Sequence, residues 1–337
     1  MRAFVIDGPR MASVVEIEAP RPAPGGVVVE VARVGLCGTD AEFFSGEMTY
    51  LHDGQADYPM RIGHEWCGTV IRAGEGTDPA WVGRRVTGDT MIGCGTCERC
   101  LGGRHHVCAS RLEIGIRGGM PGAMAGELAV PAHALLALPD SVDDTAGALI
   151  EPGGNALRAV RAAALAPGER LLVLGTGTIG LLAALIGSAR GLEVHLAGRS
   201  PRALEFAASL GFAGVSSVDE LPVFRWDAVI DASSGAALPA LALNLVEPGR
   251  RVVYIGLAGT PSPVDSRALV LKDVTAVGIL SGSAGLAEAI ALYAGGEVDP
   301  RPLVAATVTL EQAAEVLAGR RPATAGPGPK ILVDPQR

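Results

Sequence analysis

Four of the six cysteines of this chain fall within the stretch GCGTCERCLGGRHHVC, residues 93–108. Their spacing is C-x2-C-x2-C-x7-C, and three uses compete for such a cluster: a disulfide pair, a redox-active CxxC, or a metal site. Four thiolates, each about 2.3 Å from the ion, can enclose one zinc tetrahedrally and leave no position open. We therefore predict a structural zinc lobe at 93–108, with an iron–sulfur cluster or metal-free thiols as the alternatives. Its ligands would be Cys94, Cys97, Cys100 and Cys108.

Two adjacent histidines, His105 and His106, lie in the same lobe. Because four thiolates already complete a tetrahedral shell, we expect both histidines to be solvated loop residues. A closed metal site carries no chemistry itself, so the reactive centre has to lie elsewhere in the chain.

A second set of potential metal ligands is spread along the chain. The segment GLCGTD (35–40) contains Cys37, RIGHEW (61–66) contains His64 and Glu65, and ALIEPGGNAL (148–157) contains Glu151. A thiolate, an imidazole and a carboxylate can hold one zinc and leave a position for water or substrate, as a catalytic zinc requires. Their wide separation along the chain leaves other interpretations open: a core cysteine, a hydrogen-bonded histidine and a glutamate at a helix start.

The segment GTGTIG has the G-x-G-x-x-G spacing of a dinucleotide-binding loop. It directly follows the strand-like RLLVLG (170–175) and opens an apolar helical stretch, which is the context that the motif requires. The glycines permit a tight turn and a close approach to a pyrophosphate, and the helix N-terminus then faces the phosphates. The alternative is a merely glycine-rich turn. The predicted cofactor residues are Gly175, Thr176, Gly177, Thr178, Ile179 and Gly180.

The end of the next predicted strand distinguishes NADP from NAD. NAD sites usually carry an acidic residue there that holds the ribose hydroxyls. This chain has Gly198 at that position, followed by Arg199, Ser200 and Arg202. No carboxylate would repel a 2′-phosphate, and two guanidiniums could pair with it. NADP is therefore the predicted cofactor, and NAD remains possible if the arginines are only solvated surface residues.

Two kinds of structure must position these motifs: a region of alternating helices and strands, and strand-rich regions on either side of it. Between about 150 and 285, alanine- and leucine-rich helical stretches alternate with short apolar strands, which indicates a doubly wound parallel sheet. Before that region we expect strands at 27–36 and 68–73 and a long polar loop at 45–59. After about 290 the chain is strand- and turn-like. The strands expected in the parallel sheet are 170–175, 193–198, 227–233, 251–257 and 274–280.

Bulk composition limits the class of protein. A length of 337 residues suggests two domains, and 48% hydrophobic residues are enough for sizeable cores. The net charge of −8 argues against nucleic acid or an anionic membrane as the main partner. No apolar run approaches the roughly 20 residues of a membrane span, and the first ten residues lack the apolar core of a signal peptide. We therefore expect a cytoplasmic protein, in which clustered cysteines bind metal.

Taken together, these motifs resemble the zinc-dependent medium-chain dehydrogenase/reductase family, which includes alcohol, polyol, threonine and sugar dehydrogenases. The match covers nearly the whole chain, in family order. GLCGTD and GHE resemble the segments with the first two catalytic zinc ligands, and the four-cysteine stretch resembles the structural lobe. The EP at 151–152 is similar to the polyol and sugar dehydrogenase branch, while GTGTIG and KDVTAVG (272–278) resemble the cofactor half.

The resemblance implies roles for several residues. Cys37, His64 and Glu151 would hold the catalytic zinc, and Glu65 would bind it directly, alternate with water, or orient the site. Asp40 would hydrogen-bond the zinc histidine from behind and fix its tautomer. The zinc would stabilise the charge left on the substrate oxygen while a hydride passes to the nicotinamide. The catalytic residues would be Thr39, which takes the substrate hydroxyl proton, together with Glu65 and Glu42.

The chain departs from the family in three places. Many members have a histidine five residues after the first zinc cysteine, which completes a proton relay, and here that residue is Glu42. It could relay protons, contact substrate hydroxyls, or be a plain solvated glutamate. The loop at 45–59 looks longer than usual, with Tyr50, His52 and Asp53 as possible substrate contacts. An aromatic residue that the family carries before Glu127 is absent.

The resemblance thus implies a two-domain α/β enzyme. A partly open GroES-like β-barrel of residues 1–148 and 288–337 would be the catalytic domain, and residues 149–287 would form a Rossmann domain. With two zinc ions per subunit and NADP(H), it would interconvert a secondary alcohol, polyol, cyclitol or sugar and the ketone or lactone. The alternatives are an NADPH-dependent carbonyl reductase in biosynthesis, a zinc-free quinone or enoyl reductase, and a non-catalytic NADPH-binding protein. The family favours homodimers or homotetramers, with pairing near 274–286.

Overall fold

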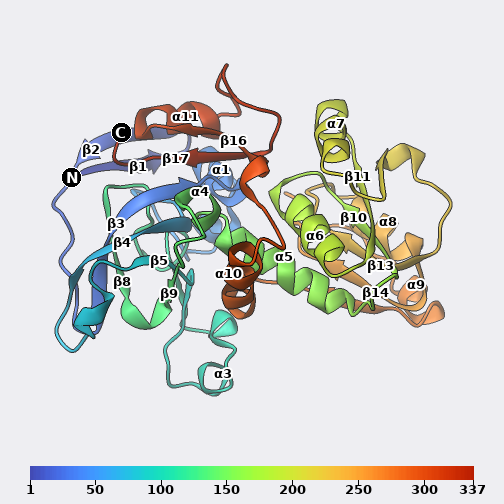
Figure 1. Ribbon diagram of the computed structural model, residues 1–337, viewed down its shortest axis with the longest axis horizontal. Coiled ribbons are helices and arrows are strands. Elements are labelled where there is room, and N and C mark those ends of the chain that lie inside the picture. Colours follow the sequence, from blue (N-terminus) through green and yellow to red (C-terminus); the bar gives the residue numbers. More distant parts are fainter.

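The computed structural model describes all residues, 1–337, and shows two lobes joined by helices. In Figure 1 the first and last parts of the chain share the left lobe, and the residues between them build the right lobe. Helices α5 (Ile150–Ala163) and α10 (Leu286–Ala294) run between the two lobes and pack on each other. The four-cysteine stretch projects below them as a separate excursion around α3 (Glu98–Leu101). No helix has both the length and the apolar character needed to cross a membrane.

The left lobe is built on a seven-stranded sheet whose path is β16-β17-β3-β4-β5-β9, with β8 paired to β3. Its longest strand, β3, is rich in valine, and both β3 and β4 are mostly buried, which suits the interior of a pleated sheet. Two small antiparallel pairs, β1–β2 and β6–β7, complete the lobe. The seven strands are β3 (Gly26–Gly35), β4 (Glu65–Ala73), β5 (Arg85–Gly88), β8 (Glu127–Pro131), β9 (Leu135–Ala137), β16 (Val304–Val308) and β17 (Lys330–Val333), and the pairs are β1 (Arg2–Gly8), β2 (Met11–Glu16), β6 (Met91–Ile92) and β7 (Leu112–Glu113).

The right lobe is a six-stranded parallel sheet with the order β12-β11-β10-β13-β14-β15. Numbered by their order along the chain, the strands run 3-2-1-4-5-6 across the sheet. This is the strand order of a dinucleotide-binding sheet, in which the order of the parallel strands reverses between the first and the fourth strand. The predicted doubly wound sheet is therefore confirmed. Its strands are β10 (Arg170–Leu174), β11 (Glu193–Gly198), β12 (Gly214–Ser217), β13 (Trp226–Asp231), β14 (Val246–Tyr254) and β15 (Thr275–Gly278).

Helices cover the parallel sheet and fill the seam between the lobes. The helices not yet given are α1 (Gly38–Ser45), α2 (Thr49–His52), α4 (Asp144–Gly147), α6 (Thr178–Ala189), α7 (Pro201–Ser209), α8 (Leu238–Leu245), α9 (Ser266–Leu271) and α11 (Leu310–Leu317). Short 3-10 turns occur at η1 (Pro79–Trp81), η2 (His105–Val107), η3 (Ala132–Ala134), η4 (Val218–Glu220), η5 (Ser283–Gly285) and η6 (Arg301–Leu303).

The region after residue 290 differs from the strand- and turn-like prediction. Strands β16 and β17 are present, but α11 stands between them. Thr309 and Gln312 form a capping box at its start, in which each side chain bonds the backbone of the other. The helix then buries Leu310, Ala313 and Leu317 on one face, so capping and a helical apolar period decide the local structure.

Candidate functional site

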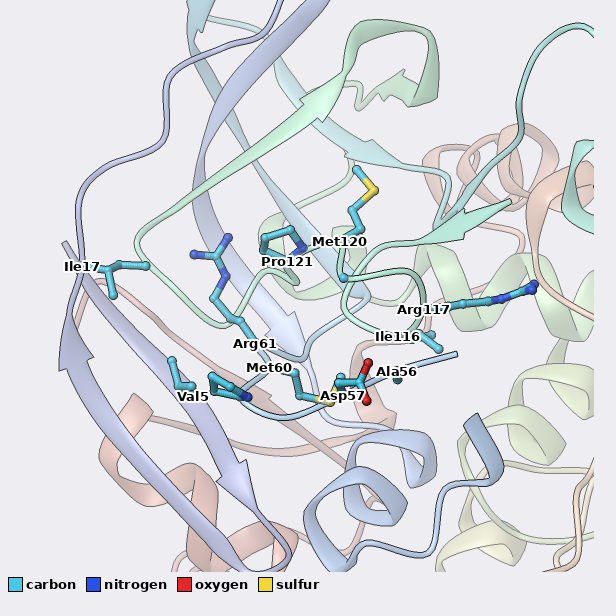
Figure 2. A pocket seen from close by; sticks show the side chains of 12 residues that line it. Val5, Ile17, Ala56, Asp57, Met60, Arg61, Ile116, Arg117, Met120 and Pro121 are labelled. Atoms are coloured by element: carbon cyan, nitrogen blue, oxygen red, sulfur yellow. The ribbon is translucent and has the colours of Figure 1, made fainter. Parts of the chain in front are cut away.

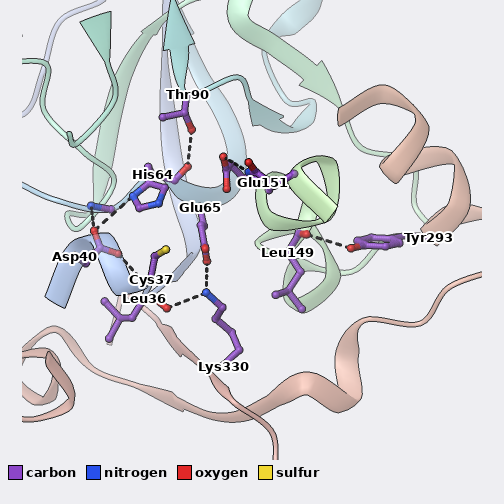
Figure 3. Close-up of polar contacts among 12 residues, drawn as sticks. Leu36, Cys37, Asp40, His64, Glu65, Thr90, Leu149, Glu151, Tyr293 and Lys330 are labelled. Atoms are coloured by element: carbon purple, nitrogen blue, oxygen red, sulfur yellow. Dashed lines mark hydrogen bonds and ion pairs between the residues drawn. The ribbon is translucent and has the colours of Figure 1, made fainter. Parts of the chain in front are cut away.

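Three potential zinc ligands converge where the first two long strands of the left lobe meet (Figure 3). Gly35 of β3 is paired with Glu65 of β4, so the residue two positions beyond β3, Cys37, lies next to the start of β4. The ligand atoms of Cys37, His64 and Glu65 all lie within 4.8 Å of one another. Cys37 also caps α1, which places Thr39 in the first turn of that helix, beside the group.

Asp40 fixes the orientation of this group from behind. Its side chain is fully buried and accepts hydrogen bonds from the backbone N–H of Cys37, at 2.8 Å, and of Gly63, at 3.3 Å. The remaining neighbour is Nδ1 of His64, 3.5 Å away. Burial opposes a charge on His64, but the Asp40 carboxylate outweighs it and raises the histidine pKa well above its usual value. Because Nδ1 faces Asp40, Nε2 is the ring nitrogen available to a metal, which would displace the proton that the raised pKa keeps there.

Glu151 lies next to this group but outside the set within 4.8 Å. It stands in the first turn of α5, is buried, and accepts a hydrogen bond from Asn155 Nδ2 at 2.8 Å. Burial raises its pKa to about 7, and proximity to His64 lowers it only in part. A desolvated carboxylate beside a thiol and an imidazole matches the donor set that zinc selects. The residues present therefore fit a zinc ion.

Sequence reasoning assigned no role to Lys330, which lies at the centre of the site. Its Nζ donates to Glu65 Oε2 at 2.6 Å and to the carbonyl of Leu36 at 2.8 Å. Only 3% of the Lys330 side chain and 2% of the Glu65 side chain are exposed. The Lys330 ammonium therefore neutralises the charge of Glu65. Glu151 has no such lysine or arginine partner. The signal was available in the sequence, because the chain has only two lysines and one of them opens an apolar strand.

The four clustered cysteines form a second site. All are free thiols, and their Sγ atoms are 3.5 Å apart for Cys97–Cys100, 3.7 Å for Cys97–Cys108 and 3.9 Å for Cys94–Cys100. Four sulfurs placed tetrahedrally about 2.3 Å from a zinc are about 3.8 Å from one another. The cluster therefore has the dimensions of a closed zinc site.

The prediction of two solvated histidines in this lobe was wrong for His106, which is only 8% exposed. The lobe packs against the right lobe through polar contacts that the sequence does not reveal. His105 Nε2 is 2.7 Å from Asp89 Oδ2, and the Ser283 hydroxyl donates to Asp89 Oδ1 at 2.8 Å. His106 itself lies against α5, where its Nε2 is 3.5 Å from Arg158 Nη2, so packing on this helix accounts for the buried ring.

The glycine loop joins β10 to α6 as the motif requires. Gly175 has a φ of +116°, and a Cβ on Gly180 would come within 1.9 Å of the Gly175 carbonyl oxygen. Nothing lies within 4 Å of a Cβ built on Gly177, so the loop is open on its ligand side. Thr178 and Ile179 form the first turn of α6. The loop lines a cavity of about 310 Å³, which fits the close approach of a pyrophosphate.

The residues predicted to distinguish NADP from NAD lie at the end of β11 and just after it. Gly198 touches the Thr176 side chain, which leaves no room for a Cβ, and Arg199 lines the cavity of the glycine loop. Ser200 precedes α7, and Arg202 lies in its first turn. Ser200 and Arg202 line an adjoining cavity of about 290 Å³, and neither cavity is lined by an aspartate or a glutamate.

A larger cavity of about 750 Å³ opens between the lobes. Glu42, Tyr50 and His52 line it from the left lobe, whereas Ser234 and Leu257 line it from the carboxyl ends of β13 and β14. Two of the three possible substrate contacts thus face the cavity, and Asp53 does not line it. Burial, followed by repulsion from Glu47, raises the pKa of Glu42. A half-buried carboxylate at this position is able to exchange protons.

A different hollow of about 260 Å³ lies on the left lobe (Figure 2). Met60, Arg61, Met120 and Pro121 surround it, and none of the candidate metal ligands lines it. Arg61 donates to the Gly122 carbonyl at 2.6 Å, and burial lowers its pKa to about 10. This hollow is therefore separate from the site of the chemistry.

Comparisons with known proteins agree with this geometry. Residues 23–140 match the model of the alcohol dehydrogenase GroES-like domain, and residues 178–295 match that of zinc-binding dehydrogenases. The chain is 33% identical over 315 residues to 2-dehydro-3-deoxy-L-galactonate 5-dehydrogenase of Pseudoalteromonas atlantica, covering 90% of each chain.

Solved structures extend the likeness to the whole fold. RspB of Escherichia coli CFT073, an alcohol dehydrogenase complexed with NADH, has a TM-score of 0.89 at 26% identity. A zinc-binding dehydrogenase of Sinorhizobium meliloti 1021, bound to NADP, has a TM-score of 0.88 at 27% identity. Each comparison covers 99% of both chains. These matches confirm the predicted GroES-like and Rossmann architecture, and the chain belongs to the zinc-dependent medium-chain dehydrogenase/reductase family, as a dehydrogenase of alcohols or polyols.

Proposed function

We propose that this enzyme reversibly oxidises a secondary hydroxyl of a polyol, cyclitol or sugar to a ketone, or a sugar hemiacetal to a lactone. NADP(H) is the preferred cofactor, and NAD is the possible alternative. One observation carries the proposal: a thiol, an imidazole and carboxylates converge at the start of β4 in one lobe, and the other lobe carries the glycine loop with its cavity. The similarity to a sugar-acid dehydrogenase supports a hydroxylated substrate.

Two zinc ions per subunit belong to this proposal. Cys37, His64 and Glu151 hold the catalytic ion, and the four cysteines of the lobe hold the structural one. When bound, the catalytic zinc supplies a Lewis acid that polarises the substrate hydroxyl. Glu65 is already paired with Lys330, so its part is to set the charge behind the ligands. The pair uses Oε2 of Glu65, so direct binding of the ion by Glu65 would use Oε1 or would require the pair to open.

The chain's own residues handle the proton. Thr39, in the first turn of α1 beside the ligand group, relays the proton: its hydroxyl accepts the proton of the substrate hydroxyl while its own proton leaves to the Glu42 carboxylate, which passes it toward the interdomain cavity. Asp40 holds His64 in the tautomer that presents Nε2. NADP, held at the glycine loop, would supply the hydride acceptor. The walls of the interdomain cavity exclude bulk water and orient the hydroxyl, which is the main contribution of positioning to such a reaction.

We also propose a cytoplasmic homodimer or homotetramer. Six free cysteines suit a reducing compartment. Strand β15 stands at the edge of the parallel sheet, and Val270, Leu271 and Leu280 near it are exposed apolar residues. An uncovered strand edge with apolar neighbours favours pairing with a second copy. Light scattering on purified protein tests this, and a monomer at micromolar concentration would overturn it.

The test of the activity is nicotinamide reduction with simple alcohols, polyols, amino-cyclitols and aldoses, each with NADP and with NAD, on protein of measured zinc content. We expect turnover of a hydroxylated substrate with NADP preferred. Cys37→Ser removes a ligand and is expected to abolish turnover, whereas Cys67→Ser changes a buried thiol outside both clusters and serves as the control. Full activity after verified loss of zinc from the Cys37 site would overturn the proposal.

A further inference from the structure

A cationic cavity lies between the start of α7 and the segment that follows α11. Its volume is about 290 Å³. The nucleotide-binding lobe contributes Thr176, Ser200 and Arg202, and the other lobe contributes Arg321 with two prolines. Neither an aspartate nor a glutamate is among the lining residues. Two domains thus each place an arginine in one small space that has no acidic side chain.

The two guanidiniums converge on a single carbonyl group. Arg202 Nη2 donates to the Gly326 carbonyl at 3.3 Å, and Arg321 Nη2 donates to the same oxygen. Arg321 Nη2 also donates to the Gly328 carbonyl at 2.8 Å. Each guanidinium has five N–H donors, so most of them remain available. Two like charges that share one carbonyl repel each other, and an anion placed between them would relieve that repulsion; burial and the charge of Arg202 accordingly lower the pKa of Arg321.

The cavity is continuous with the glycine loop. Thr176 lines both spaces, and Gly198 at the end of β11 packs against its side chain. The end of the second strand is where a dinucleotide-binding sheet meets the adenosine ribose hydroxyls. A phosphate carried on that ribose would therefore enter the cavity of Arg202 and Arg321, whereas the pyrophosphate would lie at the start of α6.

We propose that Arg321 completes the binding site for the 2′-phosphate of NADP, so that cofactor selectivity is set jointly by the two domains. Arg202 and Ser200 approach the phosphate from α7, and Arg321 approaches it from the catalytic domain. The phosphate replaces the Gly326 carbonyl as the shared acceptor and gains charge-assisted hydrogen bonds from both guanidiniums. The inference rests on the NADP preference proposed above and not on the identity of the alcohol.

The test uses calorimetric binding of two fragments to the full-length protein: adenosine 2′,5′-bisphosphate and adenosine 5′-monophosphate. Arg321→Gln is expected to weaken the bisphosphate by about tenfold or more, the scale of a lost charge-assisted pair, and to change the monophosphate less than about twofold. Arg320→Gln is the matched control, because Arg320 is adjacent and exposed but pairs with Glu315. It should leave both affinities unchanged.

Two further results decide whether Arg321 binds the 2′-phosphate directly or only supports the shape of the site. Arg202→Gln should weaken the bisphosphate similarly, and the double variant should lose less than the sum of the two effects, since both groups bind one phosphate. Equal losses for both fragments would mean that Arg321 shapes the adenosine or pyrophosphate site, and unchanged bisphosphate affinity would remove Arg321 from the site; either result overturns the inference. A bisphosphate that binds wild type no better than the monophosphate overturns the NADP preference as well. Absence of alcohol turnover alone affects only the proposed reaction.

Discussion

Replacing Lys330 by methionine tests the buried ion pair behind the ligand group. The change removes the ammonium 2.6 Å from Glu65 and leaves a carboxylate with 2% of its side chain exposed. Breaking a buried pair in this way costs about 3–5 kcal/mol, because the remaining charge is uncompensated. An unfolding entropy of about 2.1 cal/mol/K per residue, taken over 337 residues, converts this into a fall in Tm of about 4–7 °C.

The assay is thermal unfolding followed by circular dichroism, run in the Cys37→Ser background, in which no zinc at this site can pair with the freed Glu65 carboxylate. Lys330→Met combined with Glu65→Gln should recover most of the lost Tm, since neither charge then remains. Lys272→Met is the matched control: the only other lysine donates to the carbonyls of Leu243 and Asn244, and we expect it to cost at most about 1 kcal/mol.

Wild-type stability should also depend on pH through this pair. Burial opposes the charge on Lys330, but Glu65 outweighs it and raises the lysine pKa above its usual 10.5. The contribution of the pair is therefore complete below about pH 10.5 and is lost as the pH rises through the elevated pKa. A Tm for Lys330→Met within about 1 °C of that of the Cys37→Ser parent, or a double variant as unstable as the single one, would refute the reasoning.

Four shorter predictions concern the proton path and the metals. If Glu42 accepts the proton as a carboxylate, kcat/KM for alcohol oxidation falls as the pH drops toward the raised pKa of Glu42. Glu47→Gln removes a negative charge that raises this pKa, so it should move the acidic limb of the pH profile to lower pH. An acidic limb that does not shift would exclude the interaction between Glu47 and Glu42. Glu42→Gln should lower kcat/KM by about 100-fold, and wild-type rates would leave Glu42 without a relay role. Cys100→Ser should reduce zinc from two ions to one per chain by atomic absorption, and two retained ions would contradict the four-thiolate site. Asp40→Asn should weaken zinc at the Cys37 site by about 10- to 100-fold in a chelator competition, and unchanged affinity would show that Asp40 does not support the ligand.

Much of this molecule follows from local patterns in the sequence. Five of the six parallel strands (all but β12, which was not predicted), the glycine loop and the four-cysteine lobe are each encoded within a few neighbouring residues. Their periodicity, turn chemistry or ligand spacing therefore predicts them directly. The strand expected at 251–257 illustrates the limit, because β14 begins earlier, at Val246, and ends at Tyr254. Element boundaries depend on pairing with neighbouring strands.

What the sequence did not reveal depends on contacts between distant segments. Lys330 meets Glu65 across 265 residues, and Arg321 reaches Arg202 from the other domain. His106 is buried because its lobe packs on the seam. The register of β3 on β4 brings Cys37 to His64, and only the resemblance to a family, not the spacing of the two residues, predicted that meeting.

The scarcity of lysine gives the molecule a built-in reporter of partial unfolding. A protease that cleaves only after lysine has two internal targets here, one in each lobe. Lys272 follows α9 at a half-exposed position, so digestion there needs only local opening. Lys330 lies within β17 with both its charge and its backbone engaged, so that bond becomes accessible only when the catalytic domain opens. The rate of the cut after Lys330 therefore reports the opening free energy of the catalytic domain, whereas the rate of the cut after Lys272 reports only local opening beside α9, and neither measurement needs a label.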